Sequence, residues 1–249
     1  MAIKKYIPNF LTCLNLLFGC ISIAYSTQGM LGIAAYLIFA AIILDFADGF
    51  AARALKAYSE TGKQLDSLAD MVSFGTAPAF ILFYILDTQT VFLQNKLIAQ
   101  GSEQNQLLFI LPFTAFLIAI FSALRLAKFN IDPRQTENFI GLPTPATALF
   151  ISSLVFIDGT SFFGEWVRNP YFLLIIIILL SAIMVSEVSL FSLKMKNIKW
   201  SENRHRFIFI LIAVILIAAL QFTAIPLIIM LYVVLSLLLP WKKVNKHEI

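Results

Sequence analysis

Long apolar runs separated by short polar segments constrain this chain more than any other feature. The runs lie at residues 9–26, 30–54, 66–86, 107–128, 142–157, 170–191, 207–222 and 224–240. Most are close to the roughly 20 apolar residues that a helix needs to cross a bilayer. Hydrophobic residues make up 60% of the chain and charged residues only 13%. The sequence therefore predicts an all-α, polytopic transmembrane helical bundle of about eight spans.

The basic residues predict how this bundle is oriented. If both termini are cytoplasmic, sixteen of the eighteen Lys and Arg residues fall at inner helix ends or in inner loops, and only Lys96 and Arg168 fall outside. This distribution follows the positive-inside rule, and an odd number of spans would scramble it. We therefore expect a multi-pass protein of a bacterial inner (cytoplasmic) membrane. The net charge of +4 marks this topology and does not indicate nucleic-acid binding.

Four aspartates lie where the second span ends and the third begins: Asp45, Asp48, Asp66 and Asp70. Helical periodicity puts the first two on one face of the second helix and the last two on one face of the third. A short connection makes these helices antiparallel neighbours, so the four carboxylates can converge near the cytoplasmic surface. Each aspartate in the apolar zone costs about 2.5 to 3.5 kcal/mol, which predicts a strong cationic partner.

Divalent metal is the partner that this chemistry favours. Carboxylate oxygens suit Mg²⁺, Mn²⁺ or Ca²⁺, and four carboxylates could hold two ions that share their coordination with phosphate oxygens. Gly49 and Gly62 leave space for a phosphate or a flat base, although either glycine could serve helix packing instead. The alternative is that the aspartates are solvated, or paired with Arg53, Lys56 and Lys63.

The complete pattern from Asp45 to Asp70 reads D-x2-D-G-x2-A-R-x8-G-x3-D-x3-D. It resembles the motif of the CDP-alcohol phosphotransferase family, with all eight specified residues at the family's spacing. Other stretches resemble one branch of that family, the CDP-diacylglycerol:serine O-phosphatidyltransferases. They lie at residues 8–12 with Asn15, and at 71–79, 125–130 and 139–145. The resemblance covers about residues 6–150.

No tandem repeat, Gly/Ser linker or low-complexity tail divides the chain, so we expect a single integral membrane domain over residues 1–249. The resemblance implies a six-helix catalytic core at 6–191 and an additional C-terminal hairpin at 207–240. It makes Asp45, Asp48 and Asp66 metal ligands. It makes Asp70 the general base, which would also touch a second metal ion. The residues implied to line the CDP group are Gly49, Ala52, Arg53, Gly62 and Asn15.

The implied reaction transfers the phosphatidyl group of CDP-diacylglycerol to the hydroxyl of L-serine, giving phosphatidylserine and CMP in phospholipid biosynthesis. A diacyl substrate stays in the bilayer, so the site belongs at headgroup depth, facing the cytoplasm. Arg125 and Lys128, at the inner end of the fourth span, are candidates to bind the serine carboxylate, although basic residues there also mark orientation. Lys128 stands where this branch is expected to have arginine, and a lysine lacks the bidentate fork.

Several alternatives stay open at this point. The core motif concerns only the CDP-lipid half, so the acceptor could be glycerol 3-phosphate or inositol phosphate. A UbiA-like membrane prenyltransferase also holds a diphosphate with Mg²⁺, and a transporter could use an acidic cation site. Small residues recur on one face of the first span, at Thr12, Asn15, Gly19, Ser22 and Ser26. Such faces favour helix packing and make a homodimer plausible.

Overall fold

The structure, a computed structural model, describes residues 6–101, 103–132, 139–190 and 200–238. In chain order the helices are α1 (Tyr6–Thr27), α2 (Leu31–Ala54), α3 (Glu60–Asp70), α4 (Ala77–Ala99), α5 (Gln106–Ile110), α6 (Leu117–Ile131), α7 (Thr144–Leu154), α8 (Phe162–Val167), α9 (Pro170–Val185), α10 (Trp200–Leu220) and α11 (Ala224–Leu238). A π-helical segment, η2 (Met71–Thr76), joins α3 to α4, and 3-10 segments η3 (Leu111–Phe116) and η4 (Gln221–Thr223) precede α6 and α11. The predicted all-α membrane bundle is confirmed.

The described residues add two short strands to this helical fold. Strands β1 (Phe139–Ile140) and β2 (Ser189–Leu190) pair antiparallel, with Ile140 opposite Ser189. They connect the segment before α7 to the segment after α9.

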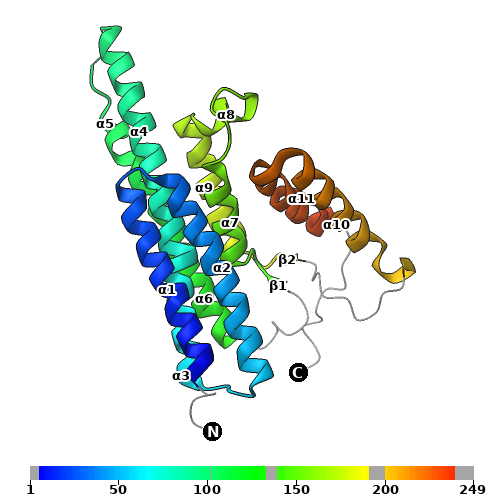
Figure 1. The fold of residues 1–249 in the computed structure, drawn as a ribbon. Helices are drawn as coiled ribbons and strands as arrows, with labels where there is room; N and C mark the ends of the chain where they lie inside the picture. The colour runs from blue at the N-terminus through cyan, green and yellow to red at the C-terminus, as the bar shows by residue number, and fades with distance from the viewer. Residues whose placement is uncertain (1–5, 102, 133–138, 191–199, 239–249) are drawn as a thin grey trace.

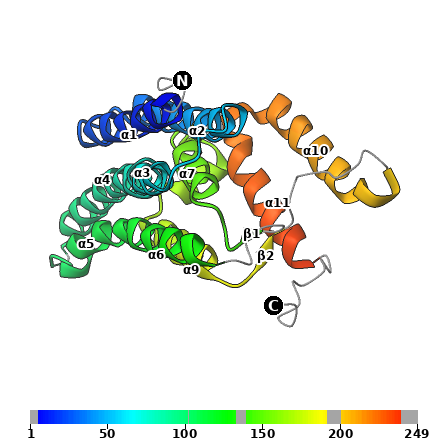
Figure 2. The same cartoon turned by 90° about the horizontal axis from the view of Figure 1, so that it is seen from below.

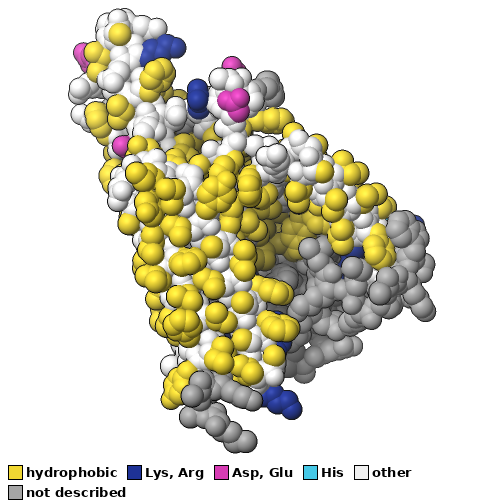
Figure 3. Space-filling model, in the orientation of Figure 1, with side chains coloured by type: hydrophobic (Ala, Val, Ile, Leu, Met, Phe, Trp, Pro, Cys, Tyr) yellow, Lys and Arg dark blue, Asp and Glu magenta, His cyan; other side chains and the backbone are white. Residues whose placement is uncertain are grey.

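The bundle has three layers of helices, visible from one end in Figure 2. Helices α1 and α2 form the first layer, α3, α4 and α7 the second, and α5, α6 and α9 the third. Helices α10 and α11 lie to one side of this stack, beyond α2 and α7 (Figure 1). Yellow side chains cover most of the flank of the bundle in Figure 3, as expected for a surface that faces lipid chains.

Each predicted apolar run contains a helix, but the helices differ in length. Five continuous helical stretches among the described residues are long and apolar enough to cross a membrane, and the last of them, Asn203–Leu238, comprises most of α10 together with η4 and α11. Helices α7 and α9 have 11 and 16 residues. At about 1.5 Å per residue both are shorter than a hydrocarbon core of about 30 Å. The count of eight spans and the cytoplasmic termini therefore stay predictions.

The third helical stretch is longer than its apolar run. It runs unbroken through α3, η2 and α4, from Glu60 to Ala99, over 40 residues. Ser59 begins it, because its Oγ accepts a hydrogen bond of 3.0 Å from the backbone N–H of Gly62. The π-helical turn follows directly after Asp70, and such turns are frequent at functional sites.

The small face of α1 is buried within the chain. Thr12, Asn15, Gly19, Ser22 and Ser26 are all buried, which confirms the packing interpretation. A Cβ atom at Gly19 would lie 2.8 Å from the Cα of Ser73, so α1 and η2 approach as closely as glycine allows. Because this face is already covered, it is not available for a homodimer, and the homodimer itself stays a prediction.

The C-terminal hairpin turns at η4. Gln221 has a φ of +51°, which ends α10 and reverses the chain into α11. Phe222 of η4 packs against Tyr36 and Phe39 of α2 and against Phe156, with ring centroids 5.1–5.8 Å away. This aromatic cluster attaches the hairpin to the bundle.

Candidate active site

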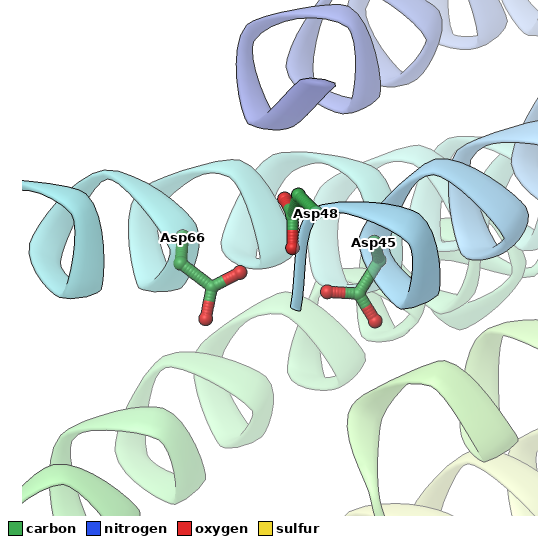
Figure 4. Close-up of side chains that lie close together, drawn as sticks. All are labelled: Asp45, Asp48 and Asp66. Carbon is green, nitrogen blue, oxygen red and sulfur yellow. The ribbon is translucent and has the colours of Figure 1, made fainter. Parts of the chain in front are cut away.

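Three of the four predicted carboxylates meet between α2 and α3. Asp45 and Asp48 lie near the C-terminal end of α2, and Asp66 lies in α3. One oxygen of each lies within 4.8 Å of the others. In Figure 4 the side chains of Asp45 and Asp66 point toward each other, with Asp48 between them. Asp48 is only 6% exposed.

No cation of the described chain neutralises this carboxylate trio. Its members repel one another, and none forms an ion pair with a described lysine or arginine. The alternative pairing with Arg53, Lys56 or Lys63 is therefore absent from the described residues. The donors are all carboxylate oxygens, the ligand type that hard divalent cations prefer. The three aspartates can hold a divalent metal ion.

A hydroxyl from α1 orients one of the carboxylates. Thr12 Oγ1 donates a hydrogen bond of 2.6 Å to Asp48 Oδ2. The sequence predicts only helix packing for Thr12. Its contact with α2 depends on the tertiary fold, so spacing along α1 could not indicate it. The one signal in the sequence was its place in the branch-like stretch at residues 8–12.

Asp70 lies one turn further along α3, beside Asn15 and Arg125. Asn15 Nδ2 lies 3.5 Å from Asp70 Oδ1, and Arg125 attracts Asp70 electrostatically. Asn15 is fully buried, and its Oδ1 has no hydrogen-bond partner. Asn15 therefore lies next to Asp70, the expected general base. It is not among the residues that line the cavity described in the next paragraph.

A cavity of about 540 Å³ opens beside the trio, between α1, α2 and the start of α3. Its lining contains Asp48 and Asp66 together with four residues expected to bind CDP, which are Gly49, Ala52, Arg53 and Gly62. It also contains residues that sequence reasoning missed, namely Pro8, Asn9, Thr12, Ala57, Tyr58, Ser59, Glu60 and Lys63. Most of these belong to a loop or to another helix, so helical spacing around the aspartates could not indicate them.

The two glycines of this cavity have different surroundings. A Cβ atom at Gly49 would meet no atom closer than 3.8 Å, from Arg53, so this glycine leaves open space. A Cβ atom at Gly62 would lie 2.9 Å from Asn9 Oδ1 and 2.9 Å from Ser59 Oγ. Gly62 is therefore required by the fold of the loop as well as by the cavity.

The two acceptor candidates also differ. Arg125 is 7% exposed, lies over the ring of Phe129 at 5.5 Å, and donates from Nη1 to Thr144 Oγ1 at 3.4 Å. Its Nε is buried without a partner. Lys128 is half-exposed and forms an ion pair of 3.9 Å with Glu187. Arg125 thus has hydrogen-bonding capacity left for a ligand near Asp70, whereas Lys128 faces another element.

The end of α6 is tied to α3 by polar contacts. Asn130 Nδ2 donates to Ser67 Oγ at 2.8 Å, and Lys63 Nζ donates to the Asn130 carbonyl at 3.4 Å. Arg125 is thereby carried on a helix whose C-terminal end is attached to α3 next to Asp66.

The greater part of this bundle matches the model of a known protein family. The family is that of the CDP-alcohol phosphatidyltransferases, and its model matches residues 5–168. The chain belongs to this family. The resemblance seen in the sequence is thus confirmed, and the carboxylate trio and cavity lie within the matched residues.

Several relatives match this chain over most of their own length. A CDP-diacylglycerol–serine O-phosphatidyltransferase of Helicobacter pylori is 31% identical over 233 residues, covering 93% of this chain and 89% of the relative. The enzyme of the same name from Bacillus subtilis is 33% identical over 188 residues, covering 74% and 89%. An archaetidylserine synthase of Methanothermobacter thermautotrophicus is 31% identical over 184 residues, covering 73% and 68%.

Proposed function

We propose that this protein transfers the phosphatidyl group of CDP-diacylglycerol to the hydroxyl of L-serine, giving phosphatidylserine and CMP. The observation that carries this proposal is the carboxylate trio, two of whose members line a cavity together with Gly49, Ala52, Arg53 and Gly62. The family supplies the CDP-alcohol chemistry, and the names of the relatives supply serine.

The cavity binds the CDP half of the donor. Gly49 leaves room for a ligand to approach the backbone of α2, and Arg53 and Lys63 offer donors to phosphate oxygens. Tyr58 is 71% exposed at the cavity, so its ring is free to stack on a base. The two acyl chains stay in the bilayer.

Asp45, Asp48 and Asp66 hold the metal. Mg²⁺ or Mn²⁺ fits the family pattern, with two ions bound. Ca²⁺ also fits these carboxylate ligands. When bound, the metal neutralises the negative charge of the diphosphate. Thr12 holds the Asp48 carboxylate in a fixed orientation through its hydrogen bond of 2.6 Å.

Asp70 acts as the general base, and Arg125 attracts it electrostatically. It takes the proton of the serine hydroxyl, and the serine oxygen attacks the phosphorus that bears diacylglycerol. The bond from this phosphorus to the oxygen of CMP breaks, and CMP leaves with the bonding electrons. Asn15 Nδ2, at 3.5 Å from Asp70 Oδ1, orients the base.

Arg125 binds the carboxylate of serine. Its buried guanidinium has an unpartnered Nε and is attracted to Asp70, so a serine bound to it would present its hydroxyl near the base. Lys128 contributes less, because Glu187 already pairs with it. The protein is an integral membrane protein. As part of this proposal, its site faces the cytoplasm from the inner membrane, and the protein forms a homodimer.

The test is release of CMP by the purified, full-length protein in detergent with CDP-diacylglycerol and Mg²⁺ or Mn²⁺. L-serine, glycerol 3-phosphate, inositol phosphate and no acceptor are compared. We expect release to depend on serine and phosphatidylserine to appear in the lipid extract.

Asp70→Asn is expected to abolish both products, whereas Asp87→Asn, an exposed aspartate of the same helical stretch, retains them. Release driven by another alcohol would keep the family and replace the acceptor. Folded protein that releases no CMP with any acceptor would overturn the proposed reaction. Light scattering in detergent tests the homodimer separately.

A further inference from the structure

A second hollow lies at the end of the bundle opposite the carboxylates. It has a volume of about 630 Å³ and separates α4 from α8 and the start of α9. Figure 1 places α8 and this part of α4 at the far end from α3. The hollow is lined by Thr88, Gln89, Phe92, Leu93, Lys96, Glu165, Arg168, Asn169, Pro170 and Tyr171.

The hollow brings together Lys96 and Arg168, the two basic residues that the positive-inside pattern leaves on the outer side. They come from different elements, α4 and the residue after α8. Figure 3 shows basic side chains on both projections at this end of the molecule. Neither residue forms an ion pair with a described acidic residue.

The lining of the hollow carries more positive than negative charge. Glu165 is the one acidic residue in it, beside Lys96 and Arg168. Asp158 lies outside this lining and attracts Arg168, and its carboxylate accepts hydrogen bonds from the backbone N–H and the hydroxyl of Thr160, at 2.9 and 2.8 Å. An anion in the hollow would therefore meet two cations and one carboxylate of the lining, with Asp158 as a second acidic neighbour of Arg168.

The remaining wall is apolar and aromatic. Phe92, Leu93, Pro170 and Tyr171 line it. Trp166 of α8, the residue after Glu165, is 49% exposed and lines a separate apolar cavity. Tyrosine and tryptophan are enriched where a membrane meets water. A ligand that suits both parts of this wall carries a negative charge and an apolar body.

We propose that this hollow binds the phosphate headgroup of an anionic phospholipid in the outer leaflet. The side chains of Lys96 and Arg168 contact the phosphate, and the apolar wall contacts the glycerol and the upper acyl chains. The N-terminus of α9 takes no part, because Asn169 Oδ1 already accepts from the backbone N–H groups of Tyr171 and Phe172. This site is independent of the proposed transfer reaction.

Tryptophan fluorescence offers a local test. Trp166 becomes the single reporter when the other two tryptophans are removed by Trp200→Phe and Trp241→Phe. The full-length protein is reconstituted in vesicles of phosphatidylcholine that contain increasing fractions of acyl-brominated phosphatidylglycerol or, separately, acyl-brominated phosphatidylcholine. We expect the anionic lipid to quench Trp166 at a several-fold lower fraction than the zwitterionic lipid.

Charge variants decide whether the hollow causes this preference. A basic residue near an anionic surface changes affinity by about fivefold, so Lys96→Gln and Arg168→Gln should each weaken the preference by about that factor. Glu165→Gln should strengthen it by a similar factor, and Lys96→Arg should retain it. Release of CMP in detergent reports that each variant is folded.

Three results would overturn the proposal. The first is equal quenching by the two lipids, and the second is a preference that none of these substitutions changes. The third is loss of the preference on adding soluble glycerol phosphate, which would assign the hollow to a free phosphate ester and not to a lipid.

Discussion

Thr12 Oγ1 lies 2.6 Å from Asp48 Oδ2, so a hydroxyl of α1 holds a carboxylate of α2 that belongs to the proposed metal site. The same hydroxyl lies 3.0 Å from the carbonyl of Pro8. Because it has a single proton, it can donate to one of these oxygens at a time. An ionised Asp48 is the stronger acceptor, which makes Thr12 part of the metal site's support.

Thr12→Val should therefore weaken metal binding while keeping the side-chain volume. Loss of an outer hydrogen bond to a metal ligand typically costs about 10- to 100-fold in metal affinity or activity. The Mn²⁺ concentration that gives half-maximal CMP release is the quantity to measure. Thr12→Ser keeps the hydroxyl and should behave like the unmodified protein, and an unchanged metal requirement in Thr12→Val would contradict the role of this contact.

Gly49→Ala should separate ligand binding from stability. Alanine in a helix is favoured over glycine by roughly 0.5 to 1 kcal/mol, and a Cβ atom here meets no atom closer than 3.8 Å. We expect thermal unfolding without substrate to shift upward, and the KM for CDP-diacylglycerol to rise because the methyl group enters the cavity. An unchanged KM would show that the donor does not approach this part of α2.

Gly62→Ala provides the contrasting case. Its Cβ atom would lie 2.9 Å from Ser59 Oγ, the atom that caps α3. Loss of such a cap costs about 1 kcal/mol, so thermal stability and CMP release should both fall. Retained stability in this variant would mean that the loop at Ser59 rearranges without cost.

The sequence predicted the parts of this molecule that depend on one helix at a time. Helical spacing placed Asp45 with Asp48 and Asp66 with Asp70, and the short connection between their helices accounts for the meeting of three of these carboxylates. Hydropathy located the helices, but it ended the third at residue 86 although the helix continues to Ala99. Hydropathy reports the depth of the membrane, whereas a helix can continue through polar residues beyond it.

Contacts between distant elements could not be predicted in this way. The hydrogen bond from Thr12 to Asp48 joins residues 36 positions apart, and the contact of Arg125 with Thr144 depends on how α7 packs on α6. The ion pair of Lys128 with Glu187 likewise depends on where the chain runs after α9. Each of these contacts redefines the role of a residue whose position in its own helix was already clear.

The turn that begins α7 depends on a glycine in a left-handed conformation. Gly141 has a φ of +73°, and a Cβ atom there would collide with the carbonyl oxygen of Met184. Its N–H donates to the Val188 carbonyl at 2.9 Å. Gly141→Ala should therefore cost more than the roughly 1 to 2 kcal/mol of left-handed strain alone.

Gly101→Ala is the matched control for this substitution. Gly101 has a φ of +83° with no atom within 4 Å of its Cβ position, so only the strain should appear. Thermal unfolding of the two variants in detergent checks the difference. Equal destabilisation would mean that the contact with Met184 relaxes.

Arg125 and Lys128 lie one turn apart on α6, and their surroundings predict opposite outcomes for substitution. Arg125→Lys keeps the charge but loses the planar fork and the buried Nε, so the KM for serine should rise by about 10- to 100-fold, the range for a hydrogen bond to a charged group. Lys128→Gln removes a half-exposed ion pair, which is typically worth about 0 to 1 kcal/mol, and should change the KM for serine little. The KM for CDP-diacylglycerol, measured in the same assays, should stay constant in both variants. A serine KM that responds to Lys128→Gln and not to Arg125→Lys would transfer the acceptor site from the buried arginine to the exposed lysine.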